Sequence, residues 1–133
     1  MRSFKFAVVG CLVLLVAACR TVPIENVTKQ AFPTDAAKLS LTQVEEAIIS
    51  AATNREWIVT RRAEGQLFAT YSPRNHMAKV EIDFDNTEFS ITYADSTNLN
   101  HSGDSIHYNY NRWVNNLRVD ILRDVSAKAA LAN

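Results

Sequence analysis

The sequence has no cysteine beyond position 19: Cys11 and Cys19 both lie among the first nineteen of its 133 residues. A disulfide, a Cys-ligated zinc site and an iron–sulfur cluster are therefore excluded from the rest of the chain. Catalysis by a cysteine nucleophile is excluded there for the same reason. The folded part must be stabilised by its hydrophobic core.

Glycine and an excess of one charge are also lacking. Only Gly65 and Gly103 follow the first nineteen residues, whereas phosphate-binding loops need several glycines close together. Fourteen Lys and Arg side chains balance fourteen Asp and Glu side chains. Because no basic field is present, nucleic acid is not an expected partner.

What the sequence does have is a characteristic start. Arg2 and Lys5 are followed by an uncharged apolar run, Phe6–Ala18. A positive segment, an apolar stretch of about 7–15 residues and small residues before a cleavage point make up a secretory leader. The run is shorter than the about 20 residues that a transmembrane helix needs. We therefore predict a signal peptide over residues 1–18.

The leader ends in Val16-Ala17-Ala18-Cys19, which resembles the lipobox of bacterial lipoproteins. The resemblance implies cleavage before Cys19 and attachment of lipid, including palmitate-type acyl chains, to this residue. An earlier match that ends at Cys11 follows too short an apolar stretch. The alternatives are an ordinary cleaved signal peptide or a short anchor helix. Arg20 follows the cysteine, and the absence of an aspartate there favours the outer membrane.

The anchor and the chain behind it predict a simple organisation. More than one acyl chain gives effectively permanent membrane attachment, whereas a single chain binds reversibly. Residues 19–38 contain Pro23 and Pro33 and show no period, which predicts a lipidated N-terminus and a flexible tether. Residues 39–133 suit one periplasmic domain.

Two segments of this domain have helical periodicity. The first is Ser40–Thr53, where Ser40 and Gln43 are spaced as a capping box. The second begins at about 105–109, with Ser105 or Asn109 as its cap, and runs to about Ala130. Each has an apolar face at three- and four-residue spacing.

Four segments between the helices predict strands: Trp57–Arg62, Gln66–Ser72, Ala78–Asp85 and Glu88–Tyr93. In the last two, apolar and polar residues alternate strictly, as in a half-buried strand. Short connections favour antiparallel neighbours. The sequence therefore predicts an α+β fold: a helix, a four-stranded antiparallel meander and a helix, with both helices packed on one face of the sheet.

In such a meander several loops and the start of the last helix meet at one end of the sheet. Loops on a rigid scaffold are common binding sites, and free N–H groups at a helix start favour anions. The residues expected at this predicted rim are Arg55, Glu56, Arg74, Asn75, His76, Asp95, Ser96, Asn98, His101 and His107.

Neither catalysis nor metal binding is predicted at the rim. His76, His101 and His107 do not have the spacing of a metal site. Ser96, His107 and Asp95 could be drawn as a hydrolytic triad, but no nucleophile-elbow pattern surrounds the serine. No catalytic residue, metal or cofactor is therefore assigned.

The stretch Ile106–Leu117 is rich in asparagine and aromatic residues. One interpretation is a surface that contacts sugar or peptidoglycan, because aromatic rings stack on sugar faces and amides bond hydroxyls. The alternative is a helix cap followed by core residues, with Tyr110 and Trp113 packed on the sheet.

His76–Ile82, Tyr93–Leu99 and Ile106–Leu117 resemble stretches of small proteobacterial envelope lipoproteins whose domain has no known activity. The resemblance implies a Gram-negative envelope and supplies no catalytic residue. The expected function is a membrane-anchored, non-enzymatic binding or structural module, with an envelope protein or peptidoglycan as partner. The alternatives are a small-ligand or glycan-binding domain that uses the rim, and an envelope hydrolase.

Overall fold

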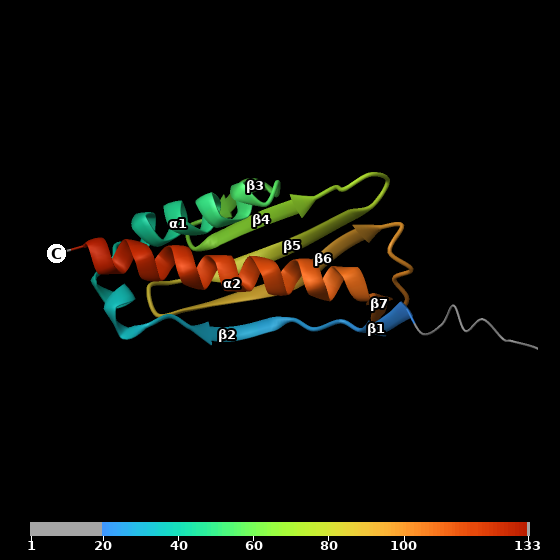
Figure 1. Ribbon diagram of the computed structural model, residues 1–133, viewed down its shortest axis with the longest axis horizontal. Helices are drawn as coiled ribbons and strands as arrows, with labels where there is room; N and C mark the ends of the chain where they lie inside the picture. The colour runs from blue at the N-terminus through green and yellow to red at the C-terminus, as the bar shows by residue number, and fades with distance from the viewer. Residues whose placement is uncertain (1–19, 133) are drawn as a thin grey trace, which may run out of the picture.

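The computed structural model describes residues 20–132 (Figure 1), so the predicted leader and Cys19 lie outside the described residues. The elements follow in the order β1 (Thr21–Pro23), β2 (Val27–Ala31), η2 (Thr34–Lys38), α1 (Leu41–Asn54), β3 (Ile58–Ala63), β4 (Gln66–Tyr71), β5 (Met77–Phe84), β6 (Glu88–Thr97), β7 (Ser105–His107) and α2 (Tyr108–Leu131).

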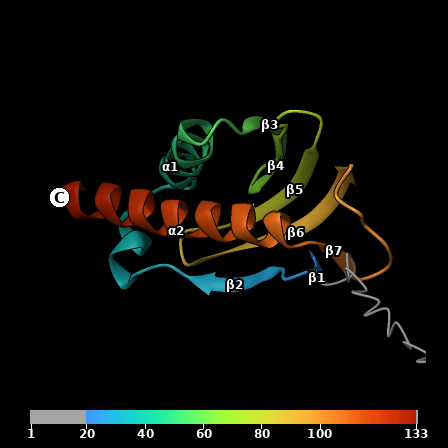
Figure 2. The same ribbon diagram turned by 45° about the vertical axis from the view of Figure 1, so that its right-hand side comes forward.

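The main sheet is antiparallel and has five strands in the order β2-β6-β5-β4-β3. A second sheet consists of β1 paired with β7. Both helices lie over the same face of the main sheet (Figures 1 and 2). The class is α+β, with strands, a helix, strands and a helix in chain order.

The prediction of a four-stranded meander preceded by a flexible tether was wrong. The segment predicted as the tether forms β1, β2 and η2, and β2 adds a fifth strand beside β6. Its sequence gives no strand signal because β2 is short, lies at the sheet edge and has an irregular register between Val27 and Gln30. Phe32, which follows β2, is 6% exposed and its ring stacks on Phe89 at 5.0 Å.

The predicted start of α1 is confirmed. The Ser40 hydroxyl accepts a hydrogen bond from the Gln43 N–H at 3.1 Å, and the Gln43 side chain accepts from the Ser40 N–H at 2.9 Å. Two of the four N–H groups that a helix start leaves unpaired are thereby satisfied. The predicted cap of α2 was wrong: His107, rather than Ser105 or Asn109, occupies that position.

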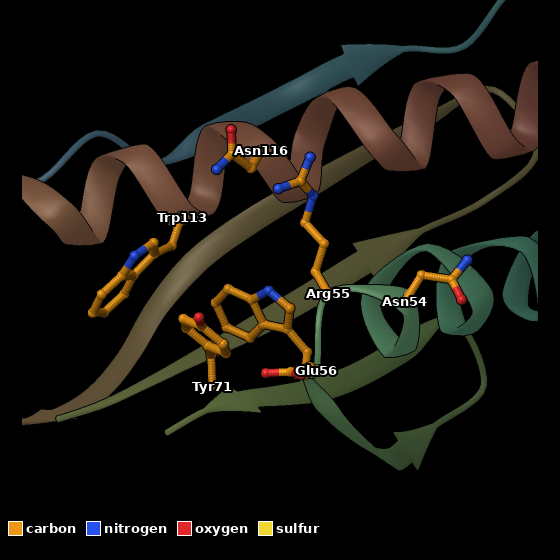
Figure 3. A pocket seen from close by; sticks show the side chains of 7 residues that line it. Asn54, Arg55, Glu56, Tyr71, Trp113 and Asn116 are labelled. Atoms are coloured by element: carbon orange, nitrogen blue, oxygen red, sulfur yellow. The ribbon is translucent and has the colours of Figure 1, made fainter. Parts of the chain in front are cut away.

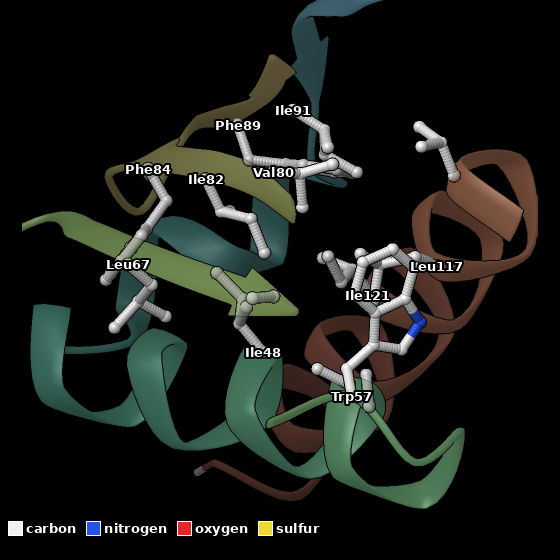
Figure 4. Close-up of a cluster of buried hydrophobic side chains, with 14 of the residues drawn as sticks. Ile48, Trp57, Leu67, Val80, Ile82, Phe84, Phe89, Ile91, Leu117 and Ile121 are labelled. Atoms are coloured by element: carbon white, nitrogen blue, oxygen red, sulfur yellow. The ribbon is translucent and has the colours of Figure 1, made fainter. Parts of the chain in front are cut away.

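The core lies between the helices and the inward face of the sheet (Figure 4). Ala78, Val80, Ile82 and Phe84 of β5 are buried, as their alternation predicts. They meet residues of both helices, whose buried members are Val44, Ala47, Ile48, Ala51, Ala52, Tyr110, Val114, Leu117, Ile121, Val125 and Ala129. Over residues 20–132, no helix is long and apolar enough to cross a membrane.

Candidate functional site

Part of the predicted rim is brought together at one end of the molecule. The His76 Nδ1 atom lies 2.7 Å from the carbonyl oxygen of Asn98, in the loop after β6. His107 lies opposite Thr21 in the small sheet, and its backbone N–H donates to the carbonyl oxygen of Leu99, the residue after Asn98, at 2.8 Å. Arg74 is exposed in the loop between β4 and β5, where its φ is +56°.

The remaining rim residues, Asp95 and Ser96 near the end of β6 and His101 in the loop after it, mainly contact their own surroundings. The exposed His101 ring stacks on Tyr93 at 4.6 Å. The Tyr93 hydroxyl lies 2.8 Å from Ser96 Oγ, while the Asp95 carboxylate accepts a hydrogen bond from the Ser96 N–H at 2.8 Å. Ser96 therefore contacts Tyr93 and Asp95 rather than His107. Among residues 20–132 no group of three His, Cys, Asp or Glu side chains could hold a metal ion.

His107 caps α2 through its ring. The Nδ1 atom accepts a hydrogen bond from the Asn109 N–H at 3.1 Å, which requires this nitrogen to be unprotonated. Partial burial lowers the pKa of His107, and the charges of Arg20 and His76 lower it further. The positive end of the α2 dipole disfavours an imidazolium at the same place.

This cap predicts a loss of stability on acidification. Because the pKa of His107 is lower in the folded than in the unfolded chain, the unfolded chain takes up the proton first as the pH falls below about 6.5. Stability is therefore fully present above that pH and decreases below it. His107→Asn keeps an acceptor at the cap without a titrating group, so its melting temperature should fall less than that of the wild type between about pH 7.5 and pH 5.5. Equal decreases in calorimetric scans would contradict this assignment.

Arg55 does not lie at the rim. It occupies the C-terminal cap of α1, and its guanidinium bonds the carboxylate of Asp120, in the middle of α2. A second cation, Arg123, lies 3.4 Å from the same carboxylate. The hydrogen bond to Asp120 raises the pKa of Arg55, so the guanidinium remains charged. Asp120 is the one buried charged side chain of residues 20–132, and it ties the end of α1 to α2.

Beside this ion pair the surface contains a hollow of about 270 Å³ between the end of α1, the end of β4 and α2 (Figure 3). We call it the aromatic hollow, and its lining residues are Asn54, Arg55, Glu56, Trp57, Tyr71, Trp113 and Asn116. In Figure 3, Arg55 extends from α1 towards α2, while Trp113 and Tyr71 stand to the other side.

Three aromatic rings form one wall of the aromatic hollow. The centre of the Tyr71 ring lies 5.4 Å from the centre of the Trp57 ring and 5.1 Å from that of the Trp113 ring. The planes of the Tyr71 and Trp113 rings make an angle of 80°. Tyr71 and Trp113 are partly exposed, whereas Trp57 is only 3% exposed. The Tyr71 ring contacts both tryptophan rings, and because it stands nearly perpendicular to Trp113 the three rings form an apolar corner rather than a flat surface.

The aromatic hollow also contains polar groups that bond nothing else in the described part of the chain. The indole N–H of Trp57, the Asn116 side-chain amide and the Glu56 carboxylate have no hydrogen-bond partner among these residues. No fully buried side-chain nitrogen or oxygen there lacks a partner. The indole N–H of Trp57 must therefore open into the hollow, where it is free to donate to a ligand.

Glu56 has a strained backbone at the edge of the aromatic hollow, with a φ of +67°. It follows the α1 cap in a Schellman arrangement: its N–H bonds the carbonyl of Thr53 at 2.9 Å, and the Trp57 N–H bonds that of Ala52 at 3.0 Å. Glycine is the usual residue here because a side chain disfavours this left-handed conformation. Such strain at a concave site is a reason to look for a role of the side chain.

Glu56→Gly should therefore stabilise the fold. The strain energy that glycine relieves in the left-handed conformation exceeds the entropic cost of the more flexible unfolded chain. The free energy of unfolding should therefore rise by about 0.5–1 kcal/mol. Ser50→Gly is the matched control, because Ser50 is exposed within α1 and glycine there should cost about 0.5–1 kcal/mol. Urea unfolding measures the change in the free energy of unfolding for each variant. A loss of stability in Glu56→Gly would contradict the presence of strain at Glu56.

The prediction of a binding rim included Arg55 and Glu56 but not the other groups of the aromatic hollow. Trp57 was predicted only as the start of a strand, and Tyr71 only as part of one. The one signal that pointed here was the density of asparagine and aromatic residues in Ile106–Leu117, which contains Trp113 and Asn116.

Comparison of the chain with protein-family models, with curated proteins and with solved structures finds no match.

Proposed function

We propose that the protein is a lipoprotein of the bacterial outer membrane, anchored through Cys19, whose periplasmic domain is a non-enzymatic binding module of the cell envelope. The observation that carries the proposal is the leader ending in Val16-Ala17-Ala18-Cys19 immediately ahead of a folded domain. The aromatic hollow, a concave surface with unpaired polar groups, supports a binding role.

The anchor would leave the domain little freedom. Only Arg20 separates Cys19 from the first residue of β1, Thr21. At about 3.3–3.6 Å per residue, two residues span at most about 7 Å. The end of the domain that carries β1, β7 and the start of α2 would therefore rest against the lipid headgroups, rather than stand off on a tether. The predicted rim residues His76, Asn98 and His107 would face the membrane.

The proposal is tested by following lipid on the protein. Cells that express the wild type, Cys19→Ser or Cys11→Ser are labelled with radioactive palmitate, and the protein is immunoprecipitated. We expect label on the wild type and on Cys11→Ser, and none on Cys19→Ser. Label retained by Cys19→Ser would overturn the anchor assignment.

The binding role has a separate test. After crosslinking of the envelope in living cells, the wild type should recover a defined partner, either an envelope protein or peptidoglycan. Recovery of neither, with the anchor intact, would contradict the binding role alone.

A further inference from the structure

We propose that the aromatic hollow binds one neutral sugar unit of a glycan chain. This inference rests on the proposed function and deepens it by naming a ligand class and the residues that hold it. Four features of the aromatic hollow favour such a ligand: its shape, its unpaired polar groups, its charge and its position on the domain.

The shape fits a single sugar ring. Pockets for drug-sized ligands usually measure about 300–1,000 Å³, so a hollow of about 270 Å³ suits one ring of a longer chain that continues into solvent. The rings of Tyr71 and Trp113 are each partly exposed and stand at 80° to each other, so one of them can offer its apolar face to a sugar ring. A pyranose ring has an apolar C–H face that packs against such surfaces, while its edge is polar on all sides.

The unpaired polar groups match that polar edge. The indole N–H of Trp57 can donate a hydrogen bond, the Glu56 carboxylate can accept one, and the Asn116 side-chain amide can do both. Hydroxyl groups and an N-acetyl amide require this mixture of donors and acceptors. A purely apolar ligand would instead cover the indole N–H of Trp57 without giving it a partner, which is unfavourable.

The charge of the aromatic hollow favours a neutral ligand. Arg55 lines it, but the guanidinium is already bonded to Asp120. An anion such as a phosphate would have to compete with that carboxylate and would also approach Glu56. A cation would approach Arg55. A neutral, hydroxylated ligand incurs neither penalty.

A second concave surface, between β2 and α2, has a similar volume but no aromatic ring among its lining residues. The Asn111 side chain there donates to the Pro23 carbonyl and accepts from the Glu25 N–H. Arg118 bonds Asn115 and Gln30. These bonds hold β2 and the segment before it against α2. Because no ring there can stack on a sugar, we assign the ligand to the aromatic hollow.

The position suits a glycan that runs alongside a membrane. Trp113 and Asn116 lie five and eight residues beyond the start of α2, or about 8–12 Å along its axis. If the start of α2 faces the bilayer, the hollow opens sideways just above the headgroups. A chain bound there would run past the domain instead of ending in it.

Binding can be followed without a label, because the two tryptophans of the protein, Trp57 and Trp113, both line the aromatic hollow. The full chain in detergent micelles is titrated with triacetylchitotriose, a neutral oligomer of N-acetylglucosamine, and the tryptophan emission is recorded. We expect a saturable change in emission at millimolar sugar or below. Calorimetry confirms the affinity in variants that lack a tryptophan.

Trp113→Ala should weaken binding at least about tenfold, equivalent to about 1.4 kcal/mol. Asn116→Ala should weaken it about three- to tenfold with little effect on folding, since the amide bonds nothing else among residues 20–132. Val119→Ala is the control: Val119 is an exposed apolar residue on α2 outside the hollow, and its variant should bind like the wild type.

The inference is overturned by the absence of saturable binding, or by binding that Trp113→Ala and Asn116→Ala leave unchanged. Inorganic phosphate or choline bound in place of the sugar, with the same sensitivity to these variants, would also overturn it. Palmitate labelling of Cys19 is independent of these titrations, so failure of the sugar assignment leaves the anchor assignment standing.

Discussion

Deletion of residues 20–33 is expected to unfold the domain. The segment contains β2, which pairs with β6 through Val27 opposite Ile91 and Gln30 opposite Phe89. It also contains Phe32, whose ring lies against Phe89 in the core. Its loss would expose this side of the core and leave β6 as an uncovered edge.

The size of the effect follows from the aromatic contact alone. Removal of a buried phenylalanine ring typically costs about 3–5 kcal/mol, and a domain of this size is stable by only about 5–15 kcal/mol. The lost strand pairing adds to that cost. Circular dichroism and amide exchange of the truncated chain should therefore show an unfolded or molten domain. Leu131→Ala is the control, because Leu131 is 86% exposed and its loss should change stability by less than about 0.5 kcal/mol.

A truncated domain with an unchanged melting temperature would show that residues 20–33 are a tether after all. Phe32→Ala is a milder version of the same test. It should lower stability by about 3 kcal/mol without removing the strand.

Arg55→Met should be the most costly change at the junction of the two helices, at about 2 kcal/mol. It keeps much of the side-chain stem but leaves the Asp120 carboxylate, only 5% exposed, with Arg123 as its remaining cation. Asp120→Ala should cost less. The Arg55 side chain is 45% exposed, and water can solvate its charge.

The double variant Arg55→Met with Asp120→Leu separates the two contributions. Apolar residues of similar size often replace a buried ion pair without loss, so the double variant should be more stable than Arg55→Met alone. Urea unfolding of the four proteins gives the coupling energy. Strictly additive effects would contradict the account of Asp120 as a buried carboxylate that depends on Arg55.

Local sequence signals predicted the elements that local chemistry determines. The capping box at Ser40 and Gln43 marks the start of α1, and the alternation in β5 reports one buried and one wet face. β2 has no such signal, because its stability comes from pairing with β6, about 60 residues away in the chain. Such non-local pairing is invisible to a search for periodicity.

The candidate site shows the same limit. Arg55 was assigned to the rim because it precedes the first predicted strand of the sheet. Its partner Asp120 lies 65 positions away and holds it elsewhere. The aromatic hollow is assembled from the end of α1, the last residue of β4 and one face of α2. Its composition was visible in part around Trp113, but its assembly depends on how α1 and α2 pack.

The most direct test of the account is the orientation of the domain on a membrane. With Cys19 lipidated, a cysteine introduced at Asn75 or at Asn86 is the one thiol available for a fluorophore. These positions lie in turns at opposite ends of β5, near opposite ends of a domain about 36 Å long by the length of α2 (Figure 1). In vesicles that carry a quencher on the lipid headgroups, a domain anchored at Cys19 should show strong quenching at position 75 and little at position 86. Equal quenching at the two positions would contradict a domain held against the bilayer by a two-residue connection.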